Sequence, residues 1–225
     1  MSELIAPVSI APVSIAPVPI ARSPIAPAPP VIILDGWEVS GRRAGPAGLT
    51  LTDCTPVAKV QLRAPIGGRA ATELGVPFGR AARDAAGTLV VGSGPGEWLL
   101  LAPPGQAEAL ASRLARIAGQ APGESVTWVD LTHGRALMRL NGHPGASVLA
   151  KLCGIDLSDE VIPDGASFRS SVASLATDVI RSDQSATRCY LLHCERSSGQ
   201  YLFDAVLRAG AEFGIAVDGF TPPGF

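Results

Sequence analysis

Residues 126–140 read VTWVDLTHGRALMRL, and we predict that two halves of the fold meet in this stretch. Its first part, 126–131, is rich in residues that favour strands. In its second part, 135–140, Ala136, Met138 and Leu140 recur at every second position and therefore share one face of a strand. The segment between the two parts joins the last strand of the first half to the first strand of the second.

The residues before this junction predict one complete βαββαβ unit. Ala58, Val60 and Leu62 alternate with polar residues, as in a half-buried strand. Glycines and a proline at 92–96 indicate a tight hairpin rather than a phosphate-binding loop, because a strand and not a helix follows them. The predicted elements are strands at 57–63, 87–92, 97–102 and 126–131, with helices at 69–74 and 107–117, the second followed by Gly119 at the position of a C-cap.

The residues after the junction repeat this order. They predict a strand at 135–140, a helix opened by Pro144, one long or bent strand from Phe168 to Arg181, a strand at 188–195, a helix from about Ser198 and a short edge strand at 215–217. The fold class is therefore α+β, with two ferredoxin-like βαββαβ halves whose antiparallel sheets carry helices. We predict one domain at 53–218, made of pseudo-repeats at about 53–131 and 132–218.

Apolar residues run consecutively in two of the predicted strands, at 98–101 and 190–192. A strand with apolar side chains on both faces must be covered on both. One cover is the helices of the same half, and the other is either the second half or a partner.

The N-terminus carries a five-residue repeat. Isoleucine recurs at positions 5, 10, 15, 20 and 25, and eight of the 20 prolines lie in residues 1–30. A period of five matches neither a helix nor a strand, and prolines remove backbone donors. We predict a disordered tail at 1–30, a linker at 31–52 and a C-terminal tail at 219–225. An alternative is a docking arm that lays its isoleucines on a partner.

Composition excludes several classes of protein. The 225 residues include 18 Lys and Arg against 20 Asp and Glu, a formal charge of −2, so a nucleic-acid partner is disfavoured. No stretch of about 18 apolar residues is free of proline and charge, which disfavours a membrane span. Four cysteines do not make a disulfide scaffold. These features favour a cytoplasmic protein.

Few residues suggest chemistry. Cys189 and His193 would lie about 13 Å apart along a strand, so they cannot share one metal ion, and we predict no metal site. Asp130 and His133 invite a catalytic interpretation, but no nucleophile motif of the G-x-S-x-G kind accompanies them. A structural role at the junction or a place in a partner interface is the better interpretation. We predict no catalytic residue.

Several segments resemble the family of gamma subunits of heterotetrameric sarcosine oxidase. The main one is VDLTHGRALMRLNGHPGASVLAKLCGIDL at 129–157, with PVAKVQLRAPIG at 56–67, GPGEWLLLAP at 94–103 and ATDVIR at 176–181 in the same order. The helix from Gln200 to Phe213 completes the set. The resemblance implies that its motif residues are structural or lie in an interface: Trp98, Asp130, His133, Arg135, Arg139, Gly142 and Lys151.

The resemblance also implies a function. Complexes of this family oxidatively demethylate sarcosine to glycine, pass the one-carbon unit to tetrahydrofolate or release formaldehyde, and make hydrogen peroxide. Alpha, beta and delta subunits would be the partners, and FAD, FMN, NAD and tetrahydrofolate would lie on those subunits, with none in this chain. The fold implied is that of the folate-binding module of aminomethyltransferases. A free-standing folate-binding protein of that type and a tail-mediated adaptor remain as alternatives.

Overall fold

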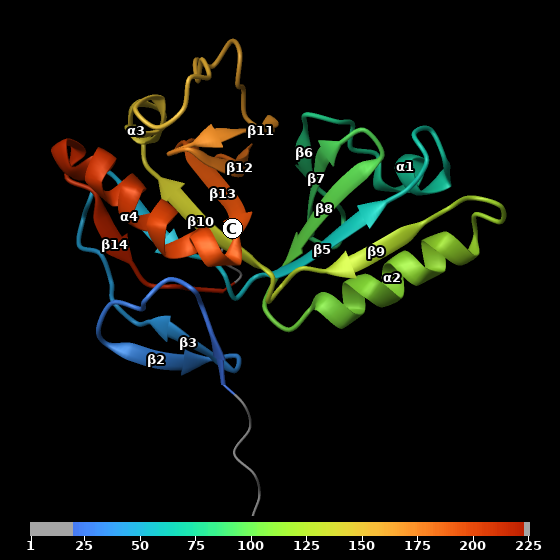
Figure 1. The fold of residues 1–225 in the computed structure, drawn as a ribbon, viewed down its shortest axis with the longest axis horizontal. Coiled ribbons are helices and arrows are strands. Elements are labelled where there is room, and N and C mark those ends of the chain that lie inside the picture. The colour runs from blue at the N-terminus through green and yellow to red at the C-terminus, as the bar shows by residue number, and fades with distance from the viewer. Residues whose placement is uncertain (1–19, 223–225) are drawn as a thin grey trace, which may run out of the picture.

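Two β-sheets pack face to face in residues 20–222, the part of the chain that the computed structural model describes (Figure 1). Helices α1 and α2 cover the outer face of one sheet, and α3 and α4 cover the outer face of the other. The chain therefore forms four layers in the order helix, sheet, sheet, helix. A small third sheet packs beside them near the N-terminus.

The first sheet belongs to the first half. Its five strands lie in the order β6-β7-β8-β5-β9, and all neighbours are antiparallel. Strand β5 lies between β8 and β9, as the crossovers of a βαββαβ unit require. The elements are β5 (Ala58–Arg63), α1 (Arg69–Leu74), β6 (Ala81–Arg83), β7 (Leu89–Gly94), β8 (Glu97–Ala102), α2 (Ala107–Gly119) and β9 (Thr127–Asp130).

The second sheet departs from the prediction. Its order is β11-β12-β13-β10-β4-β14, so β4, which precedes the first half in sequence, lies between two strands of the second half. Strand β14 pairs with β4 in parallel, and the sheet is therefore mixed rather than antiparallel. The elements are β4 (Thr50–Asp53), β10 (Arg135–Asn141), α3 (Gly145–Ala150), β11 (Ser167–Val172), β12 (Leu175–Arg181), β13 (Cys189–Glu195), α4 (Gly199–Gly210) and β14 (Ala216–Asp218), with 3₁₀ turns at Arg196–Ser198 and Ala211–Phe213.

The single strand predicted from Phe168 to Arg181 is wrong, because β11 and β12 form a hairpin there. Its turn residues, Ala173 and Ser174, have φ angles of 49° and 67°. Two consecutive positive φ values match the twist of paired strands in a two-residue hairpin. Asn-Gly is the usual sequence for such a turn, and Ala-Ser gave no such signal.

The linker predicted at 31–52 is also wrong. It holds β2 (Val31–Leu34), β3 (Trp37–Ser40) and most of β4, and the small sheet has the order β1-β3-β2, with β1 at Ala21–Arg22. The disorder predicted for 1–30 fails in its described part, because Ile25 is only 1% exposed. The rest of that prediction, residues 1–19, lies outside the described residues. In the predicted C-terminal tail, Phe220 is buried against the core that contains Trp37.

The two halves cover each other. This is one of the two ways in which the apolar strands were expected to be covered, the other being a partner chain. Trp98 and Leu100 of β8 face the helices α1 and α2, whereas Leu99 and Leu101 face the second sheet. From the second sheet, Leu137, Ile180 and Leu191 close this inner core. The consecutive apolar runs are therefore covered on both faces by the chain itself.

Candidate functional site

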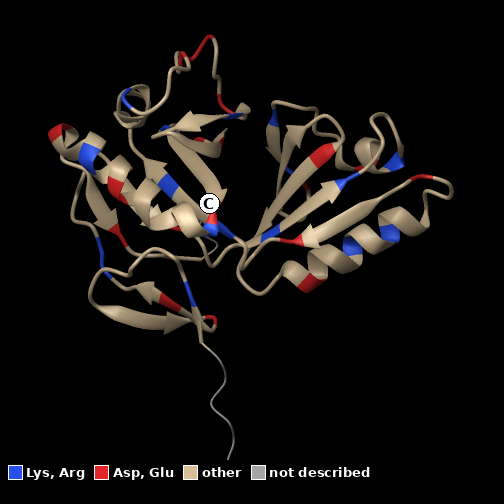
Figure 2. Cartoon of the chain, viewed as in Figure 1, with Lys and Arg blue, Asp and Glu red and all other residues tan. Residues whose placement is uncertain are grey.

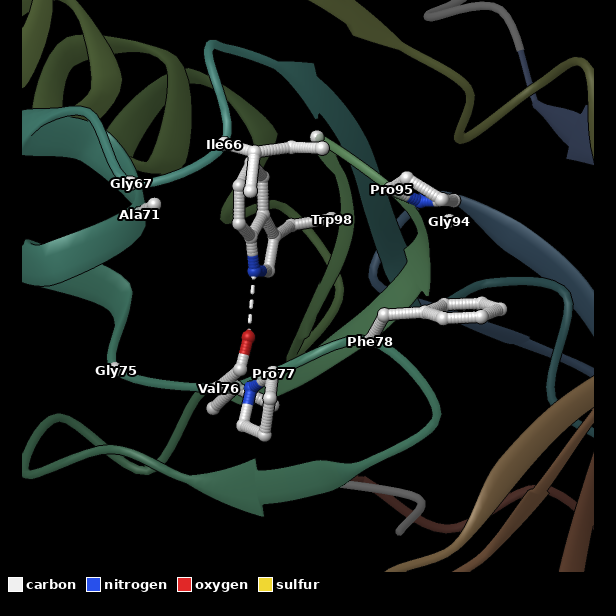
Figure 3. Close-up of a pocket in the computed structure, with 11 residues that line it drawn as sticks. Ile66, Gly67, Ala71, Gly75, Val76, Pro77, Phe78, Gly94, Pro95 and Trp98 are labelled. Carbon is white, nitrogen blue, oxygen red and sulfur yellow. Dashed lines mark hydrogen bonds between the residues drawn. The ribbon is translucent and has the colours of Figure 1, made fainter.

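An apolar cavity lies beside Trp98, at the tip of the β7–β8 hairpin (Figure 3). We call it the hairpin pocket. Its volume is about 470 Å³, and it opens between α1, the loop after β5 and the segment before β6. Its lining residues are Ile66, Gly67, Ala71, Gly75, Val76, Pro77, Phe78, Gly94, Pro95, Gly96 and Trp98.

Two glycines allow the walls of the pocket to approach. A side chain at Gly92 would place its Cβ 2.1 Å from the carbonyl oxygen of Pro77, so only glycine lets the 76–80 segment lie over β7. Gly96 turns the hairpin with a φ of 71°, and its carbonyl accepts a 3.0 Å hydrogen bond from the amide of Ala64. The indole N–H of Trp98 donates to the Val76 carbonyl at 2.7 Å and fixes the floor (Figure 3).

The chemistry of the pocket is apolar. None of its lining residues has an ionisable side chain. Ile66 and Phe78 stand at its rim with 76% and 63% of their surface exposed. Large apolar side chains that are exposed around a concavity are typical of interaction sites. The pocket is therefore suited to an aliphatic side chain and offers no group for acid–base or nucleophilic catalysis.

The junction residues Asp130, His133 and Arg135 are neighbours in the chain. Each makes a contact that supports the local fold. The carboxylate of Asp130 accepts from the amide of Thr132 at 2.8 Å, which fixes the turn. The ring of His133 stacks on Trp37 of β3, with ring centroids 4.8 Å apart. Arg135 pairs with Glu195 of β13 at 2.7 Å. This cluster ties the small N-terminal sheet to the crossing between the two halves.

The remaining motif residues lie along β10 and α3. Arg139 is half-buried between Thr52 of β4 and Leu191 of β13. Gly142 follows β10 with a φ of 139°, and a Cβ there would lie 2.2 Å from the Gly48 carbonyl oxygen. Lys151 donates to the carbonyl of Ala209, in the last turn of α4, at 3.0 Å. The structure thus separates these residues from the junction cluster and from Trp98.

A lysine lies buried between the two sheets. The alternation in β5 predicts a polar, exposed face for Lys59, yet the second sheet covers it and its side chain is fully buried. Its ammonium donates to the carbonyls of Thr55 and Val57, both at 2.7 Å. Burial lowers the pKa of Lys59 to about 7, against the opposing effect of the Asp53 carboxylate.

Asp178 and His193 form a second buried polar group between the sheets. Asp178 Oδ2 lies 2.9 Å from Nδ1 of His193, and Oδ1 accepts from Nε of Arg169 at 2.6 Å. Burial lowers the pKa of His193. Burial acts to raise the pKa of Asp178, but the hydrogen bonds from His193 and Arg169 outweigh it and lower the pKa. His193 is only 3% exposed, so this pair has no path to a substrate.

The four cysteines are buried, and none forms a disulfide within residues 20–222. Cys189 and His193 both lie on β13, as predicted. Within residues 20–222, no three side chains among His, Cys, Asp and Glu are grouped as a metal site requires. The same residues include no helix with the length and apolarity of a membrane span.

Comparisons with known proteins place this geometry in a family. No protein-family model matches the chain. A curated relative, sarcosine oxidase subunit gamma from Corynebacterium sp. (strain U-96), is 31% identical over 163 residues, which are 69% of this chain and 75% of the relative. The chain belongs to the sarcosine oxidase gamma-subunit family. The resemblance read from residues 129–157 is thereby confirmed.

Similarity to solved structures supports the assignment to this family. A chain in heterotetrameric sarcosine oxidase from Corynebacterium sp. U-96, in complex with pyrrole 2-carboxylate, matches with a TM-score of 0.63 and 26% identity, over 77% of this chain and 89% of that one. Glycine cleavage system aminomethyltransferase T from Bartonella henselae matches with a TM-score of 0.62 and 17% identity, over 84% of this chain and 55% of that one. The second match shows the fold alone, and it confirms the predicted likeness to aminomethyltransferases.

Sequence reasoning singled out Trp98 and its glycine-rich hairpin but missed the rest of the pocket. Ile66 and Phe78 lie in loops, where no hydrophobic periodicity exists to indicate a role. The available signal was a large apolar residue beside glycine or proline in a predicted loop, as in Ile66-Gly67 and Pro77-Phe78. In this gamma-subunit homologue, that signal appears twice around a single cavity.

Proposed function

We propose that this chain is the gamma subunit of a heterotetrameric sarcosine oxidase and that it has no active site of its own. The observation that carries the proposal is its 31% identity to the sarcosine oxidase gamma subunit over three quarters of that protein's length. The match of its fold to a chain of the heterotetrameric enzyme supports the same assignment. The partners are the alpha, beta and delta subunits.

The chemistry of the described residues supports a role in assembly. The hairpin pocket has no ionisable side chain in its walls. Lys59 and the Asp178–His193 pair are enclosed between the sheets, where no substrate reaches them. An enzyme site needs convergent polar groups in an accessible cavity. The gamma chain therefore contributes surface and shape to the complex, and the other subunits supply the reaction.

The reaction proposed for the complex is the oxidative demethylation of sarcosine to glycine, with transfer of the one-carbon unit to tetrahydrofolate and release of hydrogen peroxide. FAD, FMN, NAD and tetrahydrofolate are bound by the other subunits. The four cysteines are reduced thiols in the described part of the chain and suit a reducing compartment, which supports a cytoplasmic location.

Reconstitution tests this proposal. The chain is purified alone and together with alpha, beta and delta subunits of the enzyme, and flavin absorbance and sarcosine-dependent oxygen uptake are measured for each sample. We expect neither signal from the chain alone, and both from a complex that retains it. Peroxide formation by the chain alone would refute the proposal. Binding of tetrahydrofolate by the chain alone would favour the free-standing aminomethyltransferase-like alternative.

A further inference from the structure

The small N-terminal sheet ends in an exposed apolar edge strand. Strand β2, with the sequence Val-Ile-Ile-Leu, pairs with β3 on one side, and no strand of residues 20–222 lies on its other side. Val31, Ile32 and Ile33 keep 50%, 39% and 53% of their surface exposed. In Figure 1, β2 lies at the lower margin of the described chain. This edge is therefore open to a further strand.

The hydrogen-bonding groups of this edge point outwards. The amide of Gly41 donates to the carbonyl of Pro30 at 2.7 Å, at the open end of the ladder between β2 and β3. Hydrogen-bonded and non-hydrogen-bonded positions alternate in antiparallel strands, so every second residue from Pro30 bonds to β3. The N–H and C=O groups of Val31 and Ile33 therefore point away from β3, and no other strand within residues 20–222 pairs with them.

We propose that two copies of this chain pair through the β2 edge, with their β2 strands antiparallel about a two-fold axis. One register satisfies all of the outward groups. Val31 of each copy lies opposite Ile33 of the other copy, and Ile32 lies opposite itself on the axis. Each pair of Val31 and Ile33 exchanges two N–H···O bonds, and the axis repeats the pair. The two small sheets then form one continuous sheet.

The charges around the edge allow this pairing. Natural sheets commonly protect an edge strand with a charged residue, a proline or a bulge, and β2 has neither charge nor proline. In the proposed register Asp35, in the turn after β2, faces Pro29 of the second copy. Glu38, beside Ile33 on β3, is already paired with Arg22 at 2.8 Å. No like charges meet, so electrostatic repulsion does not oppose the contact.

The side chains of the edge also complement each other. On one face of the joined sheet, the valine of each copy meets the isoleucine of the other, and β-branched residues suit such cross-strand pairs. A stable interface buries about 800 Å² on each partner, which is more than a four-residue strand provides. We therefore expect a reversible dimer that dissociates on dilution. The pairing concerns the chain before it joins other subunits, so its failure would leave the family assignment unaffected.

Disulfide cross-linking of the full chain tests the register. In Ile32→Cys, the two Cα atoms of the introduced cysteines would lie about 4.5 Å apart, within the range of a disulfide. In the control Val31→Cys, the corresponding atoms would lie about 8 to 9 Å apart, which is too far. The four native cysteines are buried. Under mild oxidation we expect Ile32→Cys to form linked dimers at least about tenfold faster than Val31→Cys.

Sedimentation velocity across a range of protein concentrations measures the association itself. We expect the natural chain to change from one copy to two as its concentration rises. Ile33→Lys should remain monomeric, because it places a charge in the edge strand. Ile66→Lys is the matched control, since Ile66 is 76% exposed at the rim of the hairpin pocket, and this variant should still dimerise.

Four outcomes would overturn the inference. The first is a natural chain that stays monomeric at every concentration. The second is equal disulfide formation by Ile32→Cys and Val31→Cys, which would show random collision rather than the proposed register. Linked dimers of Ile32→Cys that form only after residues 2–19 are removed would assign the edge to the N-terminus of the same chain. Cross-linking of Ile32→Cys to another subunit, with no dimer of the chain alone, would assign the edge to that subunit.

Discussion

Replacing Lys59 by methionine should change how the stability of the chain depends on pH. Methionine has a similar length and no charge, so it fills the space between the sheets without titrating. The folded pKa of Lys59 is about 7 and its ordinary value is 10.5. Between these two values the unfolded chain keeps a proton that the folded chain has lost. The unfolded state binds more protons there, so the free energy of unfolding of the natural chain rises with pH across this window.

The size of the effect follows from the two pKa values. A difference from 10.5 to about 7 corresponds to at most about 5 kcal/mol, at ~1.4 kcal/mol per pH unit. Below pH 7 both states are protonated, and the folded chain bears the full cost of a buried ammonium. The variant has no such cost, but it leaves the carbonyls of Thr55 and Val57 without their donor, a loss of about 1–3 kcal/mol.

Urea unfolding between pH 6 and 10, followed by tryptophan fluorescence, measures this difference. Buried cysteines act in the opposite direction, since burial raises the pKa of Cys54 to about 12, but they are common to both proteins and cancel in the comparison. We expect the natural chain to gain stability relative to Lys59→Met as the pH rises above 7. Lys151→Met, at the other lysine, should show no such trend. A constant difference between natural chain and Lys59→Met across this range would refute the argument.

Three further changes have definite expected outcomes. Leu114→Ala should lower the free energy of unfolding by about 2–5 kcal/mol, because Leu114 lies on α2 and is fully buried against the first sheet, and a change within about 0.5 kcal/mol in chemical denaturation would contradict this. Gly92→Ala should cost about 1–3 kcal/mol, because the added methyl meets the Pro77 carbonyl, whereas Gly119→Ala has open space and should not destabilise the chain. Burial lowers the folded pKa of His193 below 6.5, so the stability of the natural chain should fall as pH drops below 6.5, and His193→Phe should reduce that dependence in acid titrations followed by circular dichroism.

Local pattern predicted most elements of the first half. The alternation in 57–63 and the helical spacing from Ala107 to Ile117 each recur with one period, and β5 and α2 lie where these periods indicate. The covering of both faces of β8 also follows from sequence, because four consecutive apolar residues require it. The position of β4 does not follow. Its pairing with β10 joins residues more than 80 positions apart, and no local pattern records such a contact.

The site was less predictable than the fold. The pocket depends on loops brought together by Gly92 and Gly96, and loops carry no periodic signal. Lys59 shows a different limit. Its place on the polar side of an alternating strand predicts exposure, but the second sheet packs over that side and buries it. Which face of a strand meets a second sheet is a property of the tertiary fold, so the charge of one residue does not reveal it.

The composition of the assembly tests the central claim most directly. The chain is co-expressed with the alpha, beta and delta subunits, purified through a tag on the alpha subunit and weighed intact by native mass spectrometry. We predict one species that contains all four different chains, including this one, and that oxidises sarcosine. A stable, sarcosine-oxidising complex of the alpha, beta and delta subunits from which this chain is absent would contradict its assignment as the gamma subunit.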